Sequence, residues 1–175
     1  MGTYVAFLRG INLGPTRKVD MAGVRAAAEG LGYEDVWTYL NTGNVALTTD
    51  RDAATVEREL AGALREAYGA SIDVTVRSAD ELRTVLDENP YPDESASKVT
   101  VAFLTGRPHQ DAADRVAAAA TPAEPFTFAG REVWVCYGDG QARSKLAAGF
   151  SRVVGVSATV RTVGTVSTIV ARLER

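Results

Sequence analysis

The sequence is poor in the residues that build metal centres and cross-links. Among its 175 residues there is one cysteine, Cys136, and one histidine, His109. Within one chain, a single cysteine excludes a disulfide and a cysteine-based zinc or iron–sulfur cage, and a single histidine excludes a two-histidine metal site. Runs of about 18 apolar residues, the length that spans a bilayer, are also missing. We therefore expect no cofactor, no metal and no membrane partner.

A secretion signal is missing as well. The opening residues 1–9 have no basic leader, and their apolar run is too short for a signal peptide, so we expect a cytoplasmic protein. The composition, 46% hydrophobic and 23% charged, is that of a folded globular chain. The length allows either one large domain or two small ones packed together.

Apolar periodicity predicts a β-α-β-β-α-β order in residues 1–90, followed by a trailing helix. The first helix begins after Asp20, a good N-cap, and the second ends before Gly69, which suits a left-handed cap. Ser78 and Glu81 have the spacing of a capping box and open the trailing helix. This order is the ferredoxin-like arrangement. The expected strands are 3–9, 36–40, 45–49 and 71–77, and the second helix is 52–68.

Residues 91–175 repeat this plan. Val101 to Gly106 echo Val5 to Gly10, and Thr159 to Thr162 echo Thr75 to Ser78. Between the echoes we expect helices at 110–120 and 144–154 and strands at 126–128 and 132–137. The prediction is an α+β fold of two ferredoxin-like βαββαβ halves, residues 1–90 and 91–175, related by internal duplication. Each half carries a trailing helix, and the two pack as one compact unit.

Several motifs resemble those of one bacterial family. They are Arg9-Gly10-Ile11-Asn12-Leu13-Gly14, Lys18-Val19-Asp20-Met21, Tyr39-Leu40-Asn41-Thr42-Gly43-Asn44-Val45, Asn89-Pro90-Tyr91-Pro92, Val101-Ala102-Phe103-Leu104, Arg143-Ser144-Lys145-Leu146 and Thr159-Val160-Arg161. Together they cover nearly the whole chain and resemble the domain of unknown function 1697 family. The resemblance implies the fold and a cytoplasmic setting but no activity. The family commonly continues the last motif with Asn and Trp, where this chain has Thr162 and Val163.

Basic residues gather in two acid-poor segments, although the net charge is −3. The first nineteen residues contain Arg9, Arg17 and Lys18 and no acidic residue, and residues 140–175 have six basic residues against Glu174 alone. Such segments attract anions. We therefore expect a binding module for a small anionic ligand, a nucleotide or a phosphorylated metabolite. The candidate ligand-binding residues are Arg9, Asn12, Lys18, Asn44, Ser144, Lys145 and Arg161.

For several of these residues, a purely structural role remains an alternative to ligand binding. The glycine-rich loop at 10–19 fits neither a P-loop nor a dinucleotide fingerprint and also suits packing. Asn41 and Asn44 suit a tight turn. Cys136 reads as a small buried residue and His109 as a surface residue, so no catalytic constellation is recognisable and any catalysis stays undecided.

Two alternative functions remain beside ligand binding. One is a structural or protein-interaction scaffold without a ligand, possibly a homodimer. The other is a weak single-stranded nucleic-acid binder that stacks bases on Trp134 and Tyr137, although a pI near 5.3 argues against strong binding to phosphate backbones.

Overall fold

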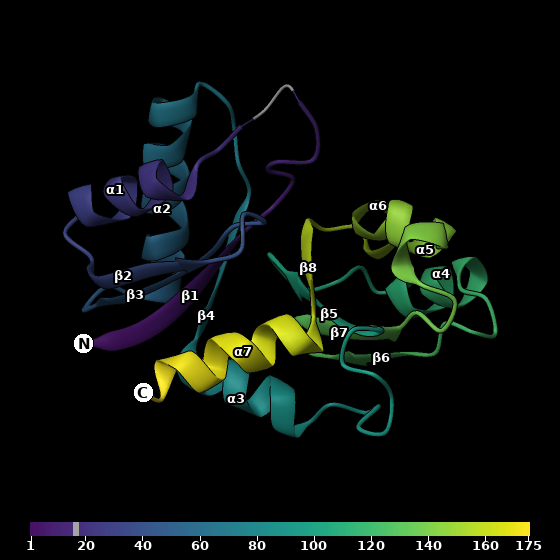
Figure 1. The fold of residues 1–175 in the computed structure, drawn as a ribbon. Helices are drawn as coiled ribbons and strands as arrows, with labels where there is room; N and C mark the ends of the chain where they lie inside the picture. The colour runs from purple at the N-terminus through teal and green to yellow at the C-terminus, as the bar shows by residue number, and fades with distance from the viewer. Residues whose placement is uncertain (16–17) are drawn as a thin grey trace. The chain divides into compact units, whose positions relative to one another are not determined.

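The structure, a computed structural model, describes residues 1–15 and 18–175 (Figure 1). The chain divides into two compact units, Met1–Leu82 and Arg83–Arg175, referred to below as unit 1 and unit 2. Each contains one four-stranded antiparallel sheet together with helices. The predicted α+β class is therefore confirmed.

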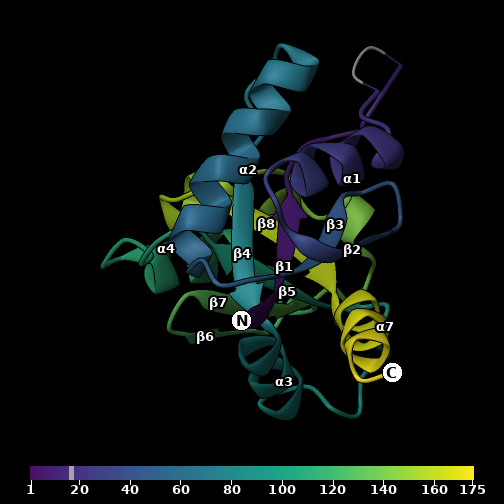
Figure 2. The same ribbon diagram turned by 90° about the vertical axis from the view of Figure 1, so that its left-hand side faces the viewer.

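Unit 1 contains a sheet with the strand order β2-β3-β1-β4. In chain order its elements are β1 (Gly2–Leu8), α1 (Met21–Gly30), β2 (Glu34–Tyr39), β3 (Asn44–Thr49), α2 (Ala53–Tyr68) and β4 (Val74–Ser78), with α3 (Ala79–Asp87) following directly. Helices α1 and α2 lie side by side on the same face of this sheet (Figures 1 and 2).

Local capping signals set the ends of the first two helices. The Asp20 carboxylate accepts a hydrogen bond from the Gly23 amide at 2.6 Å, and Asp52 accepts one from the Thr55 amide at 2.7 Å. Gly69 ends α2 with φ 66°, in the left-handed region where glycine is preferred. The predicted cap at Asp20 and the predicted stop at Gly69 are both confirmed.

The capping box predicted at the start of α3 is also present. The Glu81 amide donates to the Ser78 hydroxyl at 3.1 Å, and the Ser78 amide donates to the Glu81 carboxylate at 2.7 Å. Two amides that the helix itself cannot satisfy are thus paired reciprocally.

The core of unit 1 lies between its sheet and its two helices. Val56, Leu60 and Leu64 on α2 are fully buried, as the helical spacing predicted. Ala67, expected in the same apolar stripe, is exposed. Leu64 is the last residue of α2 in the buried core cluster, and in the following turn Tyr68, not Ala67, packs against that cluster.

Neither edge of the unit 1 sheet is a regular strand with all of its outward amides unbonded. On the edge strand β4, the Val76 amide donates to a carboxylate oxygen of Glu57, on α2, at 2.8 Å. On the opposite edge, β2 has a register shift between Glu34 and Trp37, where Asp35 adopts φ 49°. A shift of this kind is a β-bulge, which bends an edge strand.

Unit 2 contains a sheet with the strand order β6-β7-β5-β8, the same spatial order as in unit 1. Its elements are β5 (Val99–Leu104), α4 (Ala112–Ala119), β6 (Phe126–Ala129), β7 (Glu132–Cys136), the 3-10 turn η1 (Gln141–Arg143), α5 (Lys145–Ala148), α6 (Phe150–Val154), β8 (Ala158–Thr162) and α7 (Val163–Leu173). Its core holds Leu104, Val116, Val135, Leu146 and Phe150.

The single helix predicted over residues 144–154 is wrong. The structure has two short helices, α5 and α6, which meet at Gly149. Glycine has no side chain to restrict its backbone and costs about 1 kcal/mol relative to alanine inside a helix, so it favours a break.

Thr162 and Val163, the two positions that depart from the family pattern, begin α7. The Thr162 hydroxyl accepts a hydrogen bond from the Thr165 amide at 3.2 Å, and Val163 is buried. Threonine is an accepted N-cap residue. The substituted pair therefore still starts the last helix.

The sequence echoes occupy neighbouring strands with the same register in both units. In unit 1, Val5 pairs with Arg77 and Phe7 pairs with Thr75. In unit 2, Val101 pairs with Arg161 and Phe103 pairs with Thr159. Directly paired residues lie on one face of a sheet, so both sheets present a Val, Phe, Thr and Arg on one face at matching positions.

Candidate functional site

One side chain, that of Asn12, connects the loop after β1 to the β2–β3 hairpin. Its Nδ2 donates to the carbonyls of Val19 and Asn41 at 2.8 and 2.7 Å, and its Oδ1 accepts from the Val19 amide at 2.9 Å. Asn12 has φ 55°, which asparagine tolerates better than most residues. Both ends of its amide hold the loop, so Asn12 shapes the site through the backbone.

The hairpin reaches this loop because position 43 is glycine. Gly43 has φ 87°, and a Cβ atom there would lie 2.7 Å from both Ile11 Cδ1 and Leu8 Cβ. The Leu8 amide donates to the Gly43 carbonyl at 2.8 Å. The two most distinctive motifs of the sequence, at Arg9 to Gly14 and at Asn41 to Asn44, are therefore in direct contact.

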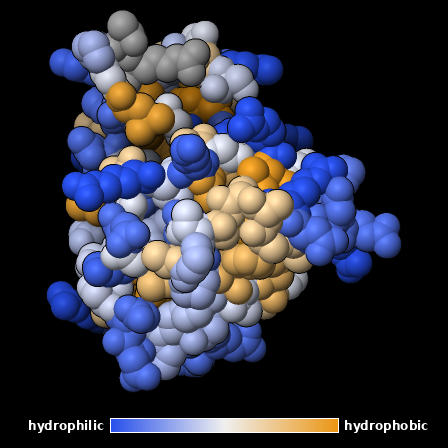
Figure 3. Space-filling view, turned by 90° about the vertical axis from the view of Figure 1, so that its right-hand side faces the viewer, coloured by the Kyte–Doolittle hydropathy of each residue, from blue (hydrophilic) through white to orange (hydrophobic). Residues whose placement is uncertain are grey.

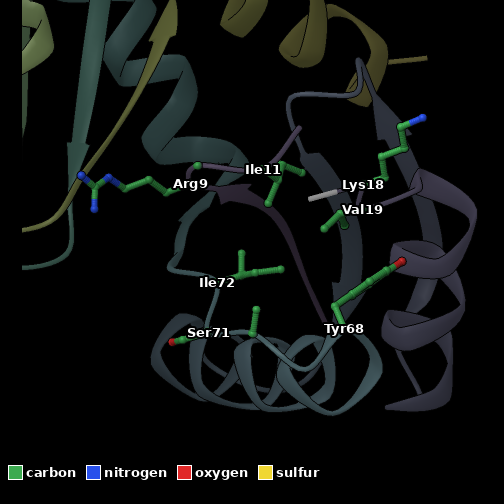
Figure 4. A pocket seen from close by; sticks show the side chains of 9 residues that line it. Arg9, Ile11, Lys18, Val19, Tyr68, Ser71 and Ile72 are labelled. Atoms are coloured by element: carbon green, nitrogen blue, oxygen red, sulfur yellow. The ribbon is translucent and has the colours of Figure 1, made fainter. Parts of the chain in front are cut away.

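A pocket of about 150 Å³ lies beside this loop in unit 1 (Figure 4). Its lining residues come from the end of β1, the loop, and the segment after α2: Arg9, Gly10, Ile11, Lys18, Val19, Tyr68, Ala70, Ser71 and Ile72. In Figure 4, Ile11, Val19 and Ile72 lie around the middle of the pocket, whereas Arg9 and Lys18 extend to opposite sides. The pocket thus has an apolar interior and a basic rim, and none of these described lining residues is a carboxylate.

The two cations on the rim have different surroundings. Arg9 forms an ion pair with Asp73, Nη1 to Oδ2 at 3.3 Å, in which both side chains are substantially exposed. Lys18 is exposed and also lines an adjoining hollow of about 340 Å³ beside Asn12 and Asn41. An exposed ion pair contributes roughly 0–1 kcal/mol, so Asp73 offers weak competition to an incoming anion. Arg17 lies outside the described residues.

The start of α1 is already occupied by a carboxylate. The hydrogen bond from the Gly23 amide holds the pKa of Asp20 below its ordinary value, so this carboxylate is ionised. The Tyr68 hydroxyl lies 3.2 Å from the carboxylate, and burial and the Asp20 charge raise the pKa of Tyr68. A helix N-terminus attracts anions, but here Asp20 takes that place. A ligand of this pocket would depend on Arg9 and Lys18.

Asn44 is buried inside its own turn. Its Nδ2 donates to the Tyr39 carbonyl at 2.7 Å and to the Thr42 hydroxyl at 3.3 Å. These bonds stabilise the hairpin in which Leu40 and Gly43 have positive φ angles. The predicted site residue Asn44 therefore lies within the turn, 1% exposed.

Ser144 and Lys145 are brought together at a second pocket, in unit 2, with a volume of about 400 Å³. The buried Ser144 hydroxyl accepts from the Ala147 amide at 3.0 Å and also hydrogen-bonds the Glu124 carboxylate, while Lys145 is exposed. Sequence reasoning missed Glu124. The three-residue spacing of Thr121 and Glu124 could have indicated their local hydrogen bond, in which the Thr121 amide donates to the Glu124 carboxylate at 2.8 Å, but not the burial of Glu124.

Arg161 lines neither of these two pockets. It lies in β8, where its Nη1 donates to the Val160 carbonyl at 2.9 Å, and burial lowers its pKa to about 10. Arg77, which occupies the matching place in β4, donates to the Val76 carbonyl at the same distance and is completely buried. The repeated arginines thus share one local conformation.

Cys136 and His109 lie as their sequence contexts predicted. Cys136 is buried in β7, and burial raises the pKa of its thiol. His109 is exposed, with Nδ1 3.6 Å from a carboxylate oxygen of Asp111. A thiol of raised pKa carries little thiolate at neutral pH, so Cys136 has the properties of a small apolar residue.

Within residues 1–15 and 18–175, no cluster of three or more histidine, cysteine or carboxylate side chains could hold a metal ion. No helix in the same part of the chain has both the length and the apolar character needed to cross a membrane. Trp134 and Tyr137, considered above as stacking platforms, are each 2% exposed, which leaves too little of either ring for a base to stack on.

These features define a class: an α+β protein of two similarly ordered sheets, with pockets formed by the connections between elements. The chain belongs to the family described as protein of unknown function (DUF1697), whose model matches residues 1–134. No curated protein matches it. Among solved structures, it is similar to the conserved bacterial protein SP0830 from Streptococcus pneumoniae, at 20% sequence identity and a TM-score of 0.76, over 98% of both chains. That likeness concerns the fold alone.

Proposed function

We propose that this protein is a cytoplasmic binding module for a small anionic ligand, with the unit 1 pocket as its site. The proposal is carried by one observation: Arg9 and Lys18 lie on the rim of a pocket whose lining, over residues 1–15 and 18–175, includes no carboxylate. An anion gains attraction from both cations, while Ile11, Val19 and Ile72 offer an apolar surface to the rest of the molecule.

Preorganisation supports the same proposal. The three hydrogen bonds of Asn12 hold Val19 and the Asn41 carbonyl in place beside the pocket. A ligand that meets backbone already held in this way does not have to supply the entropy cost of ordering it. Asn12 and Asn44 thus take part as positioning residues, and Arg9 and Lys18 as the contacts.

The test is calorimetric titration with inorganic phosphate and a panel of nucleotides and sugar phosphates. In the variant Arg9→Ala/Lys18→Ala, binding should weaken by at least about tenfold, because the attraction of both rim cations is lost. Arg58→Ala is the matched control, since Arg58 is an exposed cation of unit 1 that does not line the pocket. Equal binding by the wild type and the double variant would rule this pocket out.

We also infer that the two units are ferredoxin-like βαββαβ halves that arose by internal duplication. The common strand order and the matching Val, Phe, Thr and Arg positions support this origin. If the two sequence echoes were similar only by chance, there would be no reason for them to lie in paired strands with the same register in both sheets. An experimental structure in which the Arg77 and Arg161 registers differ by one residue would contradict it, since such a slip reverses the faces of a strand.

A further inference from the structure

The two units differ at one corner, where the helix-to-strand connection meets the strand-to-helix connection. In unit 1 these are residues 31–33, between α1 and β2, and residues 50–52, between β3 and α2. In unit 2 the corresponding segments, residues 120–125 and 137–144, are both longer. Functional sites in proteins are commonly built from such extended connections on a fixed scaffold.

In unit 1 the corner is filled by the chain's own side chains. Arg51 forms an ion pair with Glu59 at 3.0 Å and donates to the Leu31 carbonyl at 2.7 Å. Its guanidinium also lies over the Tyr33 ring, 5.3 Å from the centroid, and the Tyr33 hydroxyl donates to Glu59 at 2.9 Å. The charges of Arg51 and Glu59 therefore partner each other at this corner.

In unit 2 the same corner is hollow. It is the pocket of about 400 Å³, lined by Ala119, Thr121, Glu124, Asp139, Gly140, Arg143, Ser144 and Lys145. Its volume lies within the range of small-molecule sites, roughly 300–1,000 Å³.

The walls of this pocket are held by backbone hydrogen bonds. The Cys136 amide donates to the Pro125 carbonyl and the Gly138 amide donates to the Ala123 carbonyl, both at 3.0 Å. Gly138 allows this contact, because a Cβ atom there would lie 2.9 Å from the Ala123 oxygen. Gly140, with φ 92°, then turns the chain into η1, which carries Arg143. The hollow is thus a fixed part of the fold.

Charges of both signs line the pocket at different depths. Glu124 is 7% exposed, whereas Asp139, Arg143 and Lys145 are exposed. Burial disfavours the ionised form of Glu124, but hydrogen bonds from Ser144 and Thr121 outweigh it and hold the pKa below its ordinary value. A carboxylate can accept about four hydrogen bonds, so these partners leave acceptor capacity at Glu124.

We propose that this pocket is a second ligand site, for a small zwitterion of the α-amino acid type. The ligand's ammonium group binds the buried carboxylate of Glu124, and its carboxylate binds Arg143 and Lys145 at the rim. A simple anion would meet the charges of Glu124 and Asp139, and a simple cation would meet the two basic side chains. A molecule that carries an ammonium group and a carboxylate on one carbon atom satisfies the two ends together.

The experiment is a thermal-shift and calorimetric screen of the full chain with the standard α-amino acids at millimolar concentration and neutral pH. We expect at least one amino acid to raise the melting temperature. For each one that does, the matching α-hydroxy acid lacks the ammonium group and the matching primary amine lacks the carboxylate. Both analogues should bind at least about tenfold more weakly, a difference of about 1.4 kcal/mol.

Variants then assign the binding to this pocket. Glu124→Gln keeps an acceptor for the Thr121 amide and removes the charge, and Arg143→Ala/Lys145→Ala removes the rim cations. Each should weaken binding at least about tenfold, while Arg107→Ala, at an exposed cation outside the pocket, should leave it unchanged. If Glu124→Gln fails to fold, the rim variant provides the same test.

The proposal is overturned if no amino acid binds, if the hydroxy acid binds as well as the amino acid, or if the rim variant keeps full affinity. Arg9→Ala/Lys18→Ala alters only the unit 1 pocket, so it should leave amino-acid binding unchanged. Failure of phosphate binding in unit 1 and failure of amino-acid binding in unit 2 are thereby separate results.

Discussion

The Tyr68 hydroxyl approaches Gly23 so closely that a Cβ atom at position 23 would overlap it. The same hydroxyl lies 3.2 Å from the Asp20 carboxylate, so the end of α2 is fastened to the first turn of α1. This contact requires glycine inside a helix, where glycine is otherwise unfavourable.

Gly23→Ala should therefore have different effects on stability in two backgrounds. In the wild type the new methyl group displaces the Tyr68 hydroxyl, and the lost contact offsets the helix propensity of alanine. With Tyr68→Phe the overlapping hydroxyl is removed and the nearest remaining atoms are the Asp20 carboxylate oxygens, at 3.1 and 3.3 Å, so alanine should stabilise the protein by up to about 1 kcal/mol. Urea unfolding of the double-mutant cycle should give a coupling of about 1 kcal/mol. Gly62→Ala, in α2 with open space around it, is the control and should be stabilising in both backgrounds.

Gly43→Ala should be among the most damaging single substitutions in unit 1. It places a side chain at φ 87° and brings Cβ to 2.7 Å from Ile11 and Leu8, so the hairpin has to move away from the loop. We expect a loss of roughly 1–3 kcal/mol in the free energy of unfolding, measured by chemical denaturation. An unchanged midpoint would show that the loop and the hairpin do not depend on this contact.

Asn12 allows backbone strain to be separated from hydrogen bonding. Asn12→Gly relieves the positive φ but removes all three hydrogen bonds, whereas Asn12→Ala removes the bonds and adds strain. Both should destabilise the protein, Asn12→Ala by roughly 1 kcal/mol more. Both should also weaken phosphate binding, since Val19 and the hairpin are no longer held beside the pocket by Asn12. Retained affinity in Asn12→Gly would remove the loop from the proposed site.

The raised pKa of Tyr33 predicts that the folded protein loses stability in alkali. Burial, together with the hydrogen bond to Glu59 and its charge, raises its pKa from 10.0 to about 12 in the folded protein. Between these values the unfolded state loses the proton first, so stability is complete below pH 10 and falls as the pH rises toward 12. Tyr33→Phe should lessen this fall by about 2 kcal/mol or less, measured by urea unfolding across that range. An identical slope in the variant would show that Tyr33 titrates normally.

Cys136 should be unreactive until the protein unfolds. Its burial and raised pKa leave little accessible thiolate, so alkylation of the native chain should be at least about tenfold slower than in denaturant. The double variant Cys136→Ala/His109→Ala should retain the binding of phosphate. A rapid native reaction, or lost binding in a folded variant, would assign a function to one of these residues.

The parts of the fold that the sequence predicted correctly are those determined by near neighbours. Asp20 caps α1 and the Ser78–Glu81 box opens α3 through bonds that span three residues, and such spacings can be read directly. Gly149 shows the limit of this approach. The apolar spacing of Leu146, Phe150 and Val154 suits one helix, but the glycine between them interrupts it.

The candidate sites depend on segments far apart in the chain, which explains why they were only partly foreseen. The sequence singled out Arg9, Lys18 and Lys145 by charge, and these residues do line pockets. Glu124 was missed because its burial follows from the pairing of residues 120–125 with residues 136–138. No local pattern reports that contact. Asn12 and Asn44, selected for their amides, instead use those amides within the protein.

The bond between Glu57 and the Val76 amide bears on how this chain behaves at high concentration. An edge strand with free amides is a template on which another chain can add a strand, the first step of aggregation. Here the amide in the middle of β4 is already bound, and the bulge at Asp35 distorts β2 on the other edge. An incoming strand would first have to break the Glu57 bond or flatten the bulge. Crowded copies of the folded chain are thus kept from joining through the edges of this sheet.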